Sequence, residues 1–313
     1  MLKFTRQLNN DIYWGEVAKG EMERHLDQIE KNGFSFFKEK LHLEDRNFYD
    51  FIFDEIRADW RFCLPVKKDW KVLDIGAGLG ANTFVLAKEV AEVYALEQVA
   101  LRLKFLDFRK KHKGADNVKI ISGDALNLPF KDGSFDLIIA NGLFEWLGVT
   151  DKFKSPKKAQ EHFLQEAMRI LKTGGYLYIG IENRFAASYL LGGVDHSGLR
   201  YTSWMPRFVA DIYTKLRTGK KYQTYTYSKF GYEKILKRAG FKNLEFYLPL
   251  PGYNIPRHIV SYSHLDGLKF IVTDILGGLS LRRKILKKII RFPIIVRLWR
   301  AMFFSFDMFA QKL

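Results

Sequence analysis

The sequence predicts an α/β fold built on a mostly parallel sheet, and three observations support this prediction. Short apolar runs with the length of strands recur along the chain, and several end in glycine or in an acidic residue. Segments with helical spacing of apolar residues lie between these runs. Hydrophobic residues make up 47% of the 313 residues, enough to form one large domain with additions.

The segment before the first strand carries clustered aromatic residues near helical spacing, among them Phe34, Phe37, Phe48 and Phe51. This pattern favours helices that pack on a domain. We therefore expect residues 1–66 to form an N-terminal helical cap without a site of its own.

Cys63 is the single cysteine of the chain. One cysteine excludes a disulfide within the chain and a zinc site made of clustered thiols. Because Cys63 lies between Phe62 and Leu64, we interpret it as a core residue and not as a nucleophile. The N-terminus lacks an apolar signal core, which together with the cysteine count indicates a cytoplasmic location.

The first strand begins at Val72 and runs into the sequence DIGAGLG at residues 74–80. A strand that ends in a glycine turn brings backbone against a ligand, so this turn is typical of a nucleotide-type cofactor site. An NAD-binding turn fits the same spacing, and glycine-rich turns also form for purely structural reasons.

The second and third strands each end near a carboxylate. The run at residues 93–97 ends in Glu97, about 20 residues beyond the first glycine, where a ribose diol needs an acceptor pair. The run at residues 119–125 contains Asp124 close to the apolar sequence LPF at 128–130. This spacing suits an adenine held between one carboxylate and apolar walls.

The fourth strand, residues 137–140, leads into Asn141 and the sequence GLFEWL. Ligands of open α/β sheets bind at this carboxyl edge. A helix is predicted over residues 157–171 and a further buried strand over 176–181, which completes five strands in a β-α alternation.

The ordered motifs VLDIGAGLG, VYALE, GDALNLPF, DGSFDLIIANGLFEWL and LKTGGYLYI resemble those of class I S-adenosylmethionine-dependent methyltransferases. The resemblance covers about residues 70–262. It implies a Rossmann-like methyltransferase domain at residues 67–262, with a substrate insertion at about 183–228, and S-adenosyl-L-methionine as the cofactor.

By this resemblance, the loops after the first four strands bind the cofactor. Glu97 is expected to bind the ribose hydroxyls, Asp124 with Ala125 the adenine edge, and Asn141 the amino end through its carbonyl. A carboxylate pairs well with a diol or an ammonium group. The residues expected around the methionine moiety are Asp74, Gly76, Gly78 and Gly80, and their neighbours Ala77 and Gln98 complete the set.

The insertion after the fifth strand carries the candidate catalytic residues. A general base could take the proton of an acceptor hydroxyl during methyl transfer, and His196 is the leading candidate, with Asp195 and Glu145 as alternatives. Asp195 and His196 could instead only cap turns. No paired acids or histidine cluster indicates a metal site in the sequence, so we expect metal-independent transfer.

The sequences ENRF, GGVDHSG and YNIPRHIVSYS resemble methyltransferases associated with bacterial surface-polysaccharide assembly. Two positions depart from that pattern: Ala186 stands in place of glycine and Ser197 in place of threonine. The resemblance implies O-methylation of a saccharide or a lipid-linked saccharide. An RNA or small-molecule methyltransferase and a non-catalytic, membrane-associated scaffold in a biosynthetic complex are the alternatives.

After the insertion, Ser228 is expected to cap a helix that ends near Arg238. The resemblance implies that residues 242–248 and 258–263 form the last two of seven strands, the final one antiparallel. Residues 263–313 are expected to form a basic amphipathic helical tail.

Residues 281–313 hold nine lysines and arginines against one acid, and thus half of the net charge of +16. The mixture of basic and apolar residues is typical of an interfacial helix on anionic lipid, here at the inner face of the membrane. The apolar stretch is interrupted by Arg291, Arg297 and Arg300, and Pro293 should break or kink it. The tail is therefore not expected to span a bilayer. A helical pair packed on the domain or on a dimer partner is the alternative, and nucleic acid is a less favoured partner.

Overall fold

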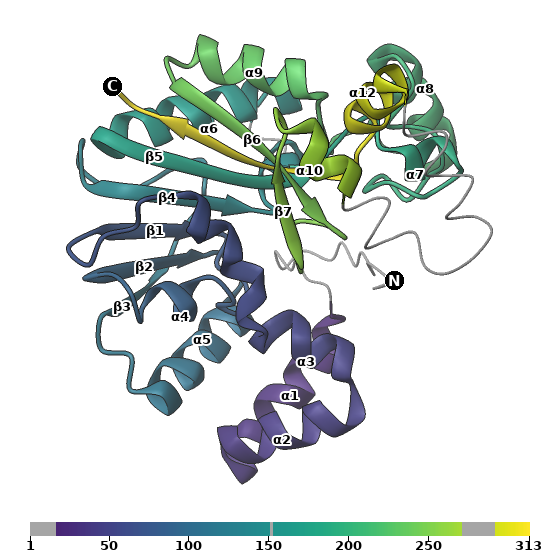
Figure 1. The fold of residues 1–313 in the computed structure, drawn as a ribbon. Helices are drawn as coiled ribbons and strands as arrows, with labels where there is room; N and C mark the ends of the chain where they lie inside the picture. Colours follow the sequence, from purple (N-terminus) through teal and green to yellow (C-terminus); the bar gives the residue numbers. More distant parts are fainter. Residues whose placement is uncertain (1–16, 151–152, 271–291) are drawn as a thin grey trace. The chain divides into compact units, whose positions relative to one another are not determined.

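A computed structural model describes residues 17–150, 153–270 and 292–313 (Figure 1). The chain divides into two compact units. Within the described residues, unit 1 runs to Ala140 and includes Arg169–Gly175, and unit 2 holds the rest.

Unit 1 contains four parallel strands in the order β3-β2-β1-β4. Val72, Leu73 and Ile75 of the first strand are completely buried, as expected for a parallel strand covered on both faces. The strands are β1 (Lys71–Ile75), β2 (Glu92–Glu97), β3 (Val118–Ser122) and β4 (Phe135–Asn141), and the helices that follow β1 and β2 are α4 (Thr83–Leu86) and α5 (Ala100–Lys113).

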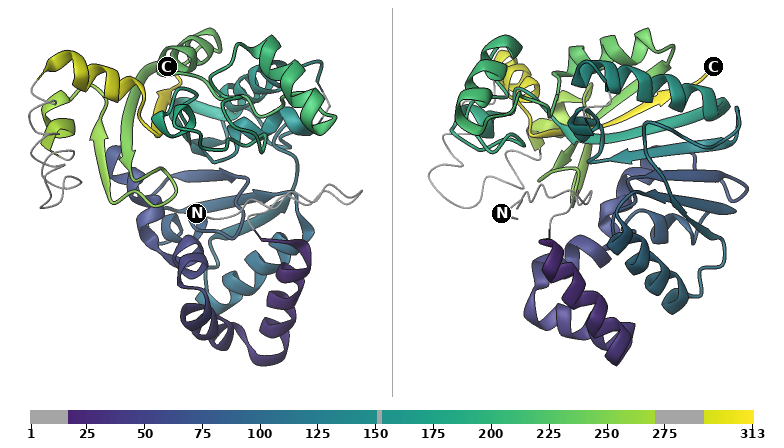
Figure 2. Two further views of the ribbon diagram at one scale, coloured as in Figure 1. Left: turned by 90° about the vertical axis from the view of Figure 1, so that its right-hand side faces the viewer. Right: turned by 180° about the vertical axis from the view of Figure 1, so that it is seen from behind.

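The predicted N-terminal helices are present in unit 1 as α1 (Lys19–Asn32), α2 (Phe34–Glu44), α3 (Arg46–Phe53) and the 3-10 helix η1 (Glu55–Cys63). Figure 2 shows these helices beside α5. Their aromatic residues form a core with α5, in which the ring centroids of Phe34 and Phe105 lie 5.5 Å apart. The prediction that these residues pack is confirmed for Phe34, Phe37, Phe48 and Phe51. Cys63 is half-buried and not a core residue, because it lies at the exposed end of η1.

Unit 2 contains the strands β5 (Leu171–Glu182, from Tyr176 onward), β6 (Lys242–Leu250), β7 (His258–Ser261) and β8 (Ser305–Gln311), in the order β5-β8-β6-β7. The two last strands that the sequence predicted are β6 and β7, which pair antiparallel. The predicted number of seven strands is too low, because β8 is an eighth. β8 pairs antiparallel with β5 and with β6, and appears in Figure 1 as the yellow arrow between them.

Unit 2 contains the two helices that the sequence predicted from local signals. The helix expected at 157–171 is α6, and Ser228 caps α9 by accepting a hydrogen bond from the backbone N–H of Gly231 at 3.3 Å. The helical elements of this unit are η2 (Phe144–Thr150), α6 (Pro156–Ile170), α7 (Ala187–Leu190), α8 (Arg207–Thr218), α9 (Lys229–Arg238), α10 (Leu265–Phe270) and α12 (Pro293–Ala301).

The C-terminal tail is helical only in part. α10 and α12 agree with the expectation for residues 263–313, but the end of the chain forms β8. Phe306, Met308 and Phe309 are buried in this strand and therefore do not face lipid. Residues 281–291, which carry most of the basic residues of the tail, lie outside the described residues. Of the helices in the described residues, none has the length and apolar character needed to span a membrane.

Candidate functional site

The glycine turn of unit 1 follows β1. Gly76, Gly78 and Gly80 have φ values of +69°, +58° and +80°, a region that side chains other than glycine rarely adopt. The backbone N–H groups of Gly76 and Ala77 donate to the carbonyl oxygen of Leu96 at 2.8 and 3.1 Å. The turn is thereby fixed to the end of β2, where Glu97 lies.

The glycines of this turn differ in what surrounds them. A Cβ atom on Gly78 would have open space around it, with only the Gly76 carbonyl oxygen within 4 Å, at 3.9 Å. A Cβ atom on Gly80 would lie 2.6 Å from the ring of Phe84 and 2.8 Å from Leu106. Gly78 thus leaves bare backbone beside an open space, whereas Gly80 is needed for packing.

Glu97 is 4% exposed, and its carboxylate accepts backbone hydrogen bonds from the glycine turn and from the residues that follow β2. Gly78 N–H donates to Oε2 at 2.9 Å, and the N–H groups of Gln98 and Val99 donate to Oε1 at 2.8 and 2.9 Å. The guanidinium of Arg102 lies 3.6 Å from Oε2. The carboxylate is thereby held in one orientation at the end of β2, and its binding of the ribose hydroxyls stays a prediction.

Asp124 and Ala125 are half-buried at the end of β3. Gly123 N–H donates to the carbonyl oxygen of Glu97 at 3.0 Å, which places the third strand end beside the second. A Cβ atom on Gly123 would lie 2.9 Å from the end of the Leu96 side chain, which would have to shift to make room for it. The Asp124 carboxylate accepts the Leu126 N–H at 2.9 Å and holds the turn that follows.

Asp74 is buried at the end of β1 and accepts a hydrogen bond from the Thr83 hydroxyl at 2.6 Å. Burial raises the pKa of Asp74 to about 6, and the Thr83 hydroxyl opposes this shift. The bond to Thr83 joins the strand end to the first turn of α4 and so gives Asp74 a structural role in the loop.

Two buried side chains join the N-terminal helices to the same loop. The Trp60 indole N–H donates to Asn82 Oδ1 at 3.0 Å. Arg109 donates to the carbonyl oxygens of Leu79 and Ile52 at 2.6 and 3.0 Å. The helical cap therefore fixes the conformation of the glycine turn, a role that the sequence did not reveal.

Unit 2 brings together three ionisable side chains: Glu145 from η2, Glu182 at the end of β5 and His196 from the insertion. His196 Nε2 lies 3.1 Å from Glu182 Oε2 and 3.8 Å from Glu145 Oε1. Glu145 is completely buried, and neither of its carboxylate oxygens has a hydrogen-bond partner among the described residues. We call Glu145, Glu182 and His196 the acidic trio.

The charges in the acidic trio shift the pKa values of its members. Burial lowers the pKa of His196, but the charges of Glu182 and Glu145 outweigh burial and raise it to about 9. Burial and the charge of Glu182 raise the pKa of Glu145 to about 8, whereas His196 holds the pKa of Glu182 below its usual value despite burial. The two carboxylates therefore favour the protonated form of the His196 imidazole.

Glu182 is a site residue that sequence reasoning missed. The Tyr253 hydroxyl donates to Glu182 Oε1 at 3.1 Å, and the Tyr253 N–H donates to the Ser305 hydroxyl oxygen at 3.2 Å. Glu182 is the last residue of β5, as Glu97 is the last residue of β2. This similarity could have identified Glu182 from the sequence. Ser305 belongs to β8, so the unforeseen strand supports the acidic trio.

Known proteins are similar to this chain over the segment that contains the glycine turn and the acids at the strand ends. A family model described as a methyltransferase domain matches residues 73–179. Malonyl-[acyl-carrier protein] O-methyltransferase of Methylococcus capsulatus is 30% identical over 224 residues, which are 65% of this chain and 74% of that protein. The chain belongs to the class I S-adenosylmethionine-dependent methyltransferases.

Two further similar proteins are a plant methyltransferase and a protein of known structure. The 2-methyl-6-phytyl-1,4-hydroquinone methyltransferase 1 of rice is 30% identical over 176 residues, which are 55% of this chain and 44% of that protein. A solved methyltransferase structure from Aquifex aeolicus is 16% identical, covers 88% of this chain and 98% of its own, and has a TM-score of 0.48.

The methyltransferase has a Rossmann-like fold with antiparallel C-terminal strands, and its cofactor is S-adenosylmethionine. The residues of unit 1 fit this cofactor, because Gly78 leaves open space and Glu97 and Asp124 lie at neighbouring strand ends. The contacts of individual residues with the cofactor remain predictions.

Asn141 ends β4, and in unit 2 it lies close to β5. Both polar atoms of its side chain are buried and have no hydrogen-bond partner among the described residues. A Cβ atom on Gly180 would lie 2.5 Å from Asn141 Oδ1 and 3.1 Å from the Tyr253 ring. The methyltransferase thus holds an unsatisfied amide that a polar ligand could pair with, and it needs glycine at position 180.

Asp195 does not join the acidic trio, although it is adjacent to His196. Its carboxylate accepts hydrogen bonds from Ser197 N–H at 2.8 Å, Ser197 hydroxyl at 2.6 Å, Thr202 hydroxyl at 2.8 Å and Tyr222 hydroxyl at 3.1 Å. With its acceptor positions occupied, Asp195 holds the insertion together. This role matches the alternative that Asp195 caps turns, whereas His196 lies in the trio.

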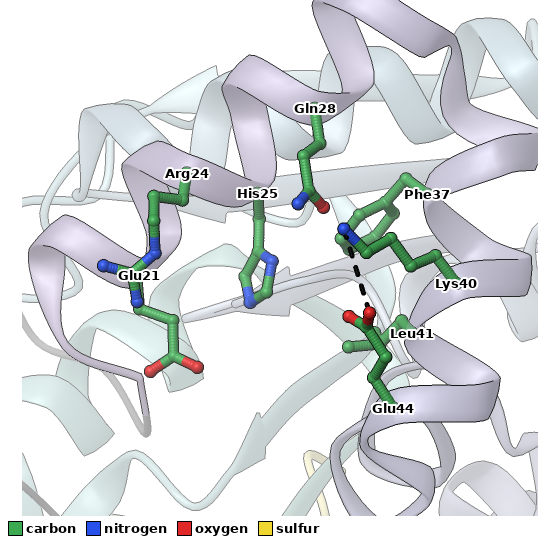
Figure 3. A pocket seen from close by; sticks show the side chains of 8 residues that line it. All are labelled: Glu21, Arg24, His25, Gln28, Phe37, Lys40, Leu41 and Glu44. Carbon is green, nitrogen blue, oxygen red and sulfur yellow. Dashed lines mark ion pairs between the residues drawn. The ribbon is translucent and has the colours of Figure 1, made fainter.

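A cavity of about 210 Å³ lies between α1 and α2 of unit 1 (Figure 3). It is lined by mixed charged and apolar side chains, and Lys40 pairs with Glu44 at 3.8 Å at its rim. Burial lowers the pKa of His25, which points into this cavity, as Figure 3 shows. None of the predicted site residues lines it.

Proposed function

We propose that this methyltransferase transfers a methyl group from S-adenosylmethionine to a hydroxyl group of a saccharide or a lipid-linked saccharide. In this proposal the glycine turn and the strand-end acids of unit 1 hold the cofactor. The acidic trio of unit 2 binds the acceptor hydroxyl and takes up its proton.

The observation that carries the proposal is the acidic trio together with the buried polar atoms of Glu145 and Asn141 that have no hydrogen-bond partner among the described residues. Unpaired buried polar atoms are costly, and Glu145 and Asn141 each contribute two in unit 2. A hydroxyl group donates and accepts hydrogen bonds, so it can pair with a carboxylate and with an amide at once. A ligand rich in hydroxyl groups satisfies such a set.

The chemistry of the transfer requires little from the protein beyond positioning. S-adenosylmethionine supplies an electrophilic methyl group. The acceptor oxygen forms the new C–O bond and loses its proton, and a group of the acidic trio within hydrogen-bond reach can accept that proton. Alignment of the reacting atoms supplies much of the remaining rate enhancement.

The insertion supports a saccharide acceptor through the residues that carry the polysaccharide-assembly resemblance. Arg184 donates to the carbonyl oxygens of Ser203 and Met205 at 2.8 and 2.6 Å, and Asn183 donates to those of Ala301 and Phe303, both at 2.8 Å. These motif residues build the frame of unit 2 that holds His196. The half-buried Trp146 ring, 4.8 Å from the His196 ring, offers an aromatic face on which a sugar ring can pack.

Radiolabelled S-adenosylmethionine and a panel of lipid-linked saccharides and polysaccharide fragments test the proposal. We expect the label to appear as an O-methyl ether, identified by mass spectrometry and NMR. Glu182→Gln should lower turnover by about 100-fold or more without loss of cofactor binding, because it removes a proton acceptor. The matched control is Glu245→Gln, an exposed acid in β6 of the same unit. Cofactor binding without methylation of any hydroxyl in the panel would refute the proposed acceptor.

We also propose that the methyltransferase attaches to the surface of an anionic membrane. Phe292, Ile294 and Leu298 at and within α12 are 61%, 67% and 58% exposed, and Arg297 is exposed beside them. The mixture of exposed apolar and basic side chains suits an interfacial helix. The stretch at 281–291 that the sequence also assigned to lipid lies outside the described residues.

A further inference from the structure

We propose that Glu145, Glu182 and His196 form a binding site for one divalent transition-metal ion, of the class of Mn²⁺ or Zn²⁺. No sequence motif reveals this site, because the three residues are separated along the chain by 14 or more positions. Only the fold of unit 2 brings them together.

The geometry of the ligand atoms suits an ion of this size. One ligand atom from each residue can be chosen so that all three lie within 4.8 Å of one another. His196 Nε2 lies 3.1 Å from Glu182 Oε2 and 3.8 Å from Glu145 Oε1. At metal–ligand bond lengths of about 2.0–2.2 Å, two ligands on one ion lie roughly 3 to 3.5 Å apart. Small side-chain rotations therefore bring all three atoms into bonding distance.

The chemistry of the ligands selects the class of ion. Carboxylate oxygens bind Mg²⁺, Ca²⁺ and Mn²⁺, whereas an imidazole nitrogen favours Zn²⁺, Fe²⁺ and their neighbours. Two carboxylates with one imidazole therefore point to Mn²⁺ or Zn²⁺ over Mg²⁺ or Ca²⁺.

The burial of Glu145 is a second, independent observation. Its side chain is 0% exposed, its Oε1 atom faces His196 at 3.8 Å, and neither of its oxygens makes a hydrogen bond with the described residues. A buried carboxyl group without hydrogen bonds is costly, and a divalent ion would displace its proton and compensate the charges of Glu145 and Glu182 together.

The surroundings of the acidic trio supply the support that metal sites usually have. The Tyr253 hydroxyl donates to Glu182 Oε1 at 3.1 Å and leaves Oε2 directed at His196. Outer partners of this kind orient the ligands of an ion and raise its affinity. Three protein ligands also leave coordination positions open, at which water or an acceptor hydroxyl could bind.

Equilibrium dialysis of the purified full-length protein with Mn²⁺ or Zn²⁺ alone, without cofactor or acceptor, tests the metal site. Because neither substrate is present, the result does not depend on the proposed function. We expect one ion per chain, measured by elemental mass spectrometry, and weaker binding of Mg²⁺ and Ca²⁺. Glu182→Gln and Glu145→Gln, which keep the shape of the side chain, should each weaken binding of Mn²⁺ or Zn²⁺ by about tenfold or more. His196→Ala should do the same.

His264→Asn is the matched control, because His264 is exposed in the same unit and lies outside the trio. This variant should bind the ion as the unchanged protein does. Circular dichroism of each variant shows whether it is folded, and the two glutamine variants keep the test informative if His196→Ala does not fold. Absence of stoichiometric binding, or binding that the glutamine variants leave unchanged, would overturn the proposal.

Discussion

Asp195 and His196 are adjacent residues with different surroundings and therefore different roles. The Asp195 carboxylate accepts four hydrogen bonds within the insertion, whereas His196 lies beside two carboxylates. The sequence DH identified the right segment but could not separate the two side chains. Side-chain direction in an irregular loop depends on contacts with Thr202 and Tyr222, which no local pattern specifies.

Ser197 provides a test of this structural role. Ser197→Ala removes the hydroxyl that donates to Asp195 at 2.6 Å, and we expect it to lower the free energy of unfolding by about 1 kcal/mol. Ser197→Thr keeps the hydroxyl and should change stability less than the alanine variant does. Urea unfolding of both variants measures the difference. Equal losses in both would contradict the role of this hydrogen bond.

Gly78 and Gly80 should respond differently to alanine. A Cβ atom at position 78 meets open space, so Gly78→Ala should cost only about 1 kcal/mol of backbone strain. It should weaken S-adenosylmethionine binding by about tenfold or more, because the new methyl group fills the space beside the turn. Gly80→Ala places a methyl group 2.6 Å from the Phe84 ring and should lower stability by about 3 kcal/mol. Thermal unfolding and calorimetric titration with the cofactor separate the two effects.

Asp307 should make stability depend on pH. Burial raises the pKa of Asp307 from its ordinary value of 3.8 to about 7, and the Tyr178 hydroxyl, which donates to it at 2.8 Å, opposes this shift. The folded state therefore binds this proton more tightly than the unfolded state. Its contribution to the free energy of unfolding is largest below the unfolded pKa and decreases as pH rises through about 7.

The size of this pH effect follows from the shift. At about 1.4 kcal/mol per pKa unit, the full loss for Asp307 is at most roughly 4 kcal/mol. Asp307→Asn keeps an acceptor for Tyr178 and removes the titration. Urea unfolding at several pH values between 4 and 8 should show a smaller decrease of stability with pH in the variant. Parallel curves for the two proteins would show that Asp307 does not titrate in this way.

At the scale of elements, the sequence predicted the parallel strands of unit 1 because their signals are local. Val72 and Leu73 begin a run that is buried on both faces, and the glycine turn and Glu97 follow at fixed spacings. The sequence did not predict β8, because Phe306 and Phe309 follow a basic segment and resemble the apolar side of an interfacial helix. Likewise, the acidic trio depends on long-range pairing that positions Glu182 and Tyr253.

The residues of β8 should therefore be important for the stability of unit 2. Phe306 is completely buried, and its ring lies 6.0 Å from that of Phe246 and 6.3 Å from that of Tyr232. Phe306→Ala should lower the free energy of unfolding by about 3–5 kcal/mol. The control is Phe304→Ala, since Phe304 is 40% exposed just before the strand, and its loss should be smaller than that of Phe306→Ala. Chemical unfolding followed by circular dichroism measures both, and equal losses would contradict the buried role of β8.

At the scale of the whole molecule, the fold does not account for the net charge of +16. A charge of this size affects association with anionic partners and not the choice of fold. Exposed apolar residues accompany basic ones on two helices of unit 2. α12 exposes Ile294 and Leu298, and α8 exposes Phe208, Ile212 and Leu216, spaced by four residues, next to Lys215 and Arg217.

We expect binding to vesicles that contain phosphatidylglycerol, and weaker binding to vesicles of phosphatidylcholine alone. Binding should decrease as salt is added, because ions screen the attraction between basic side chains and the anionic surface. Replacing Phe292, Ile294 and Leu298 together by serine removes apolar contact from α12 without changing charge, and should reduce vesicle flotation.

Leu43→Ser with Phe62→Ser is the matched control for this experiment, because both residues are exposed and apolar but belong to unit 1. The same three-residue replacement on α8, at Phe208, Ile212 and Leu216, shows whether a second helix contributes. If the α12 variant floats with anionic vesicles as well as the unchanged protein does, α12 is not a membrane contact. Retention of RNA in place of vesicles would assign the positive charge to nucleic acid, since a polyanion attracts the same basic residues but does not require the exposed apolar ones.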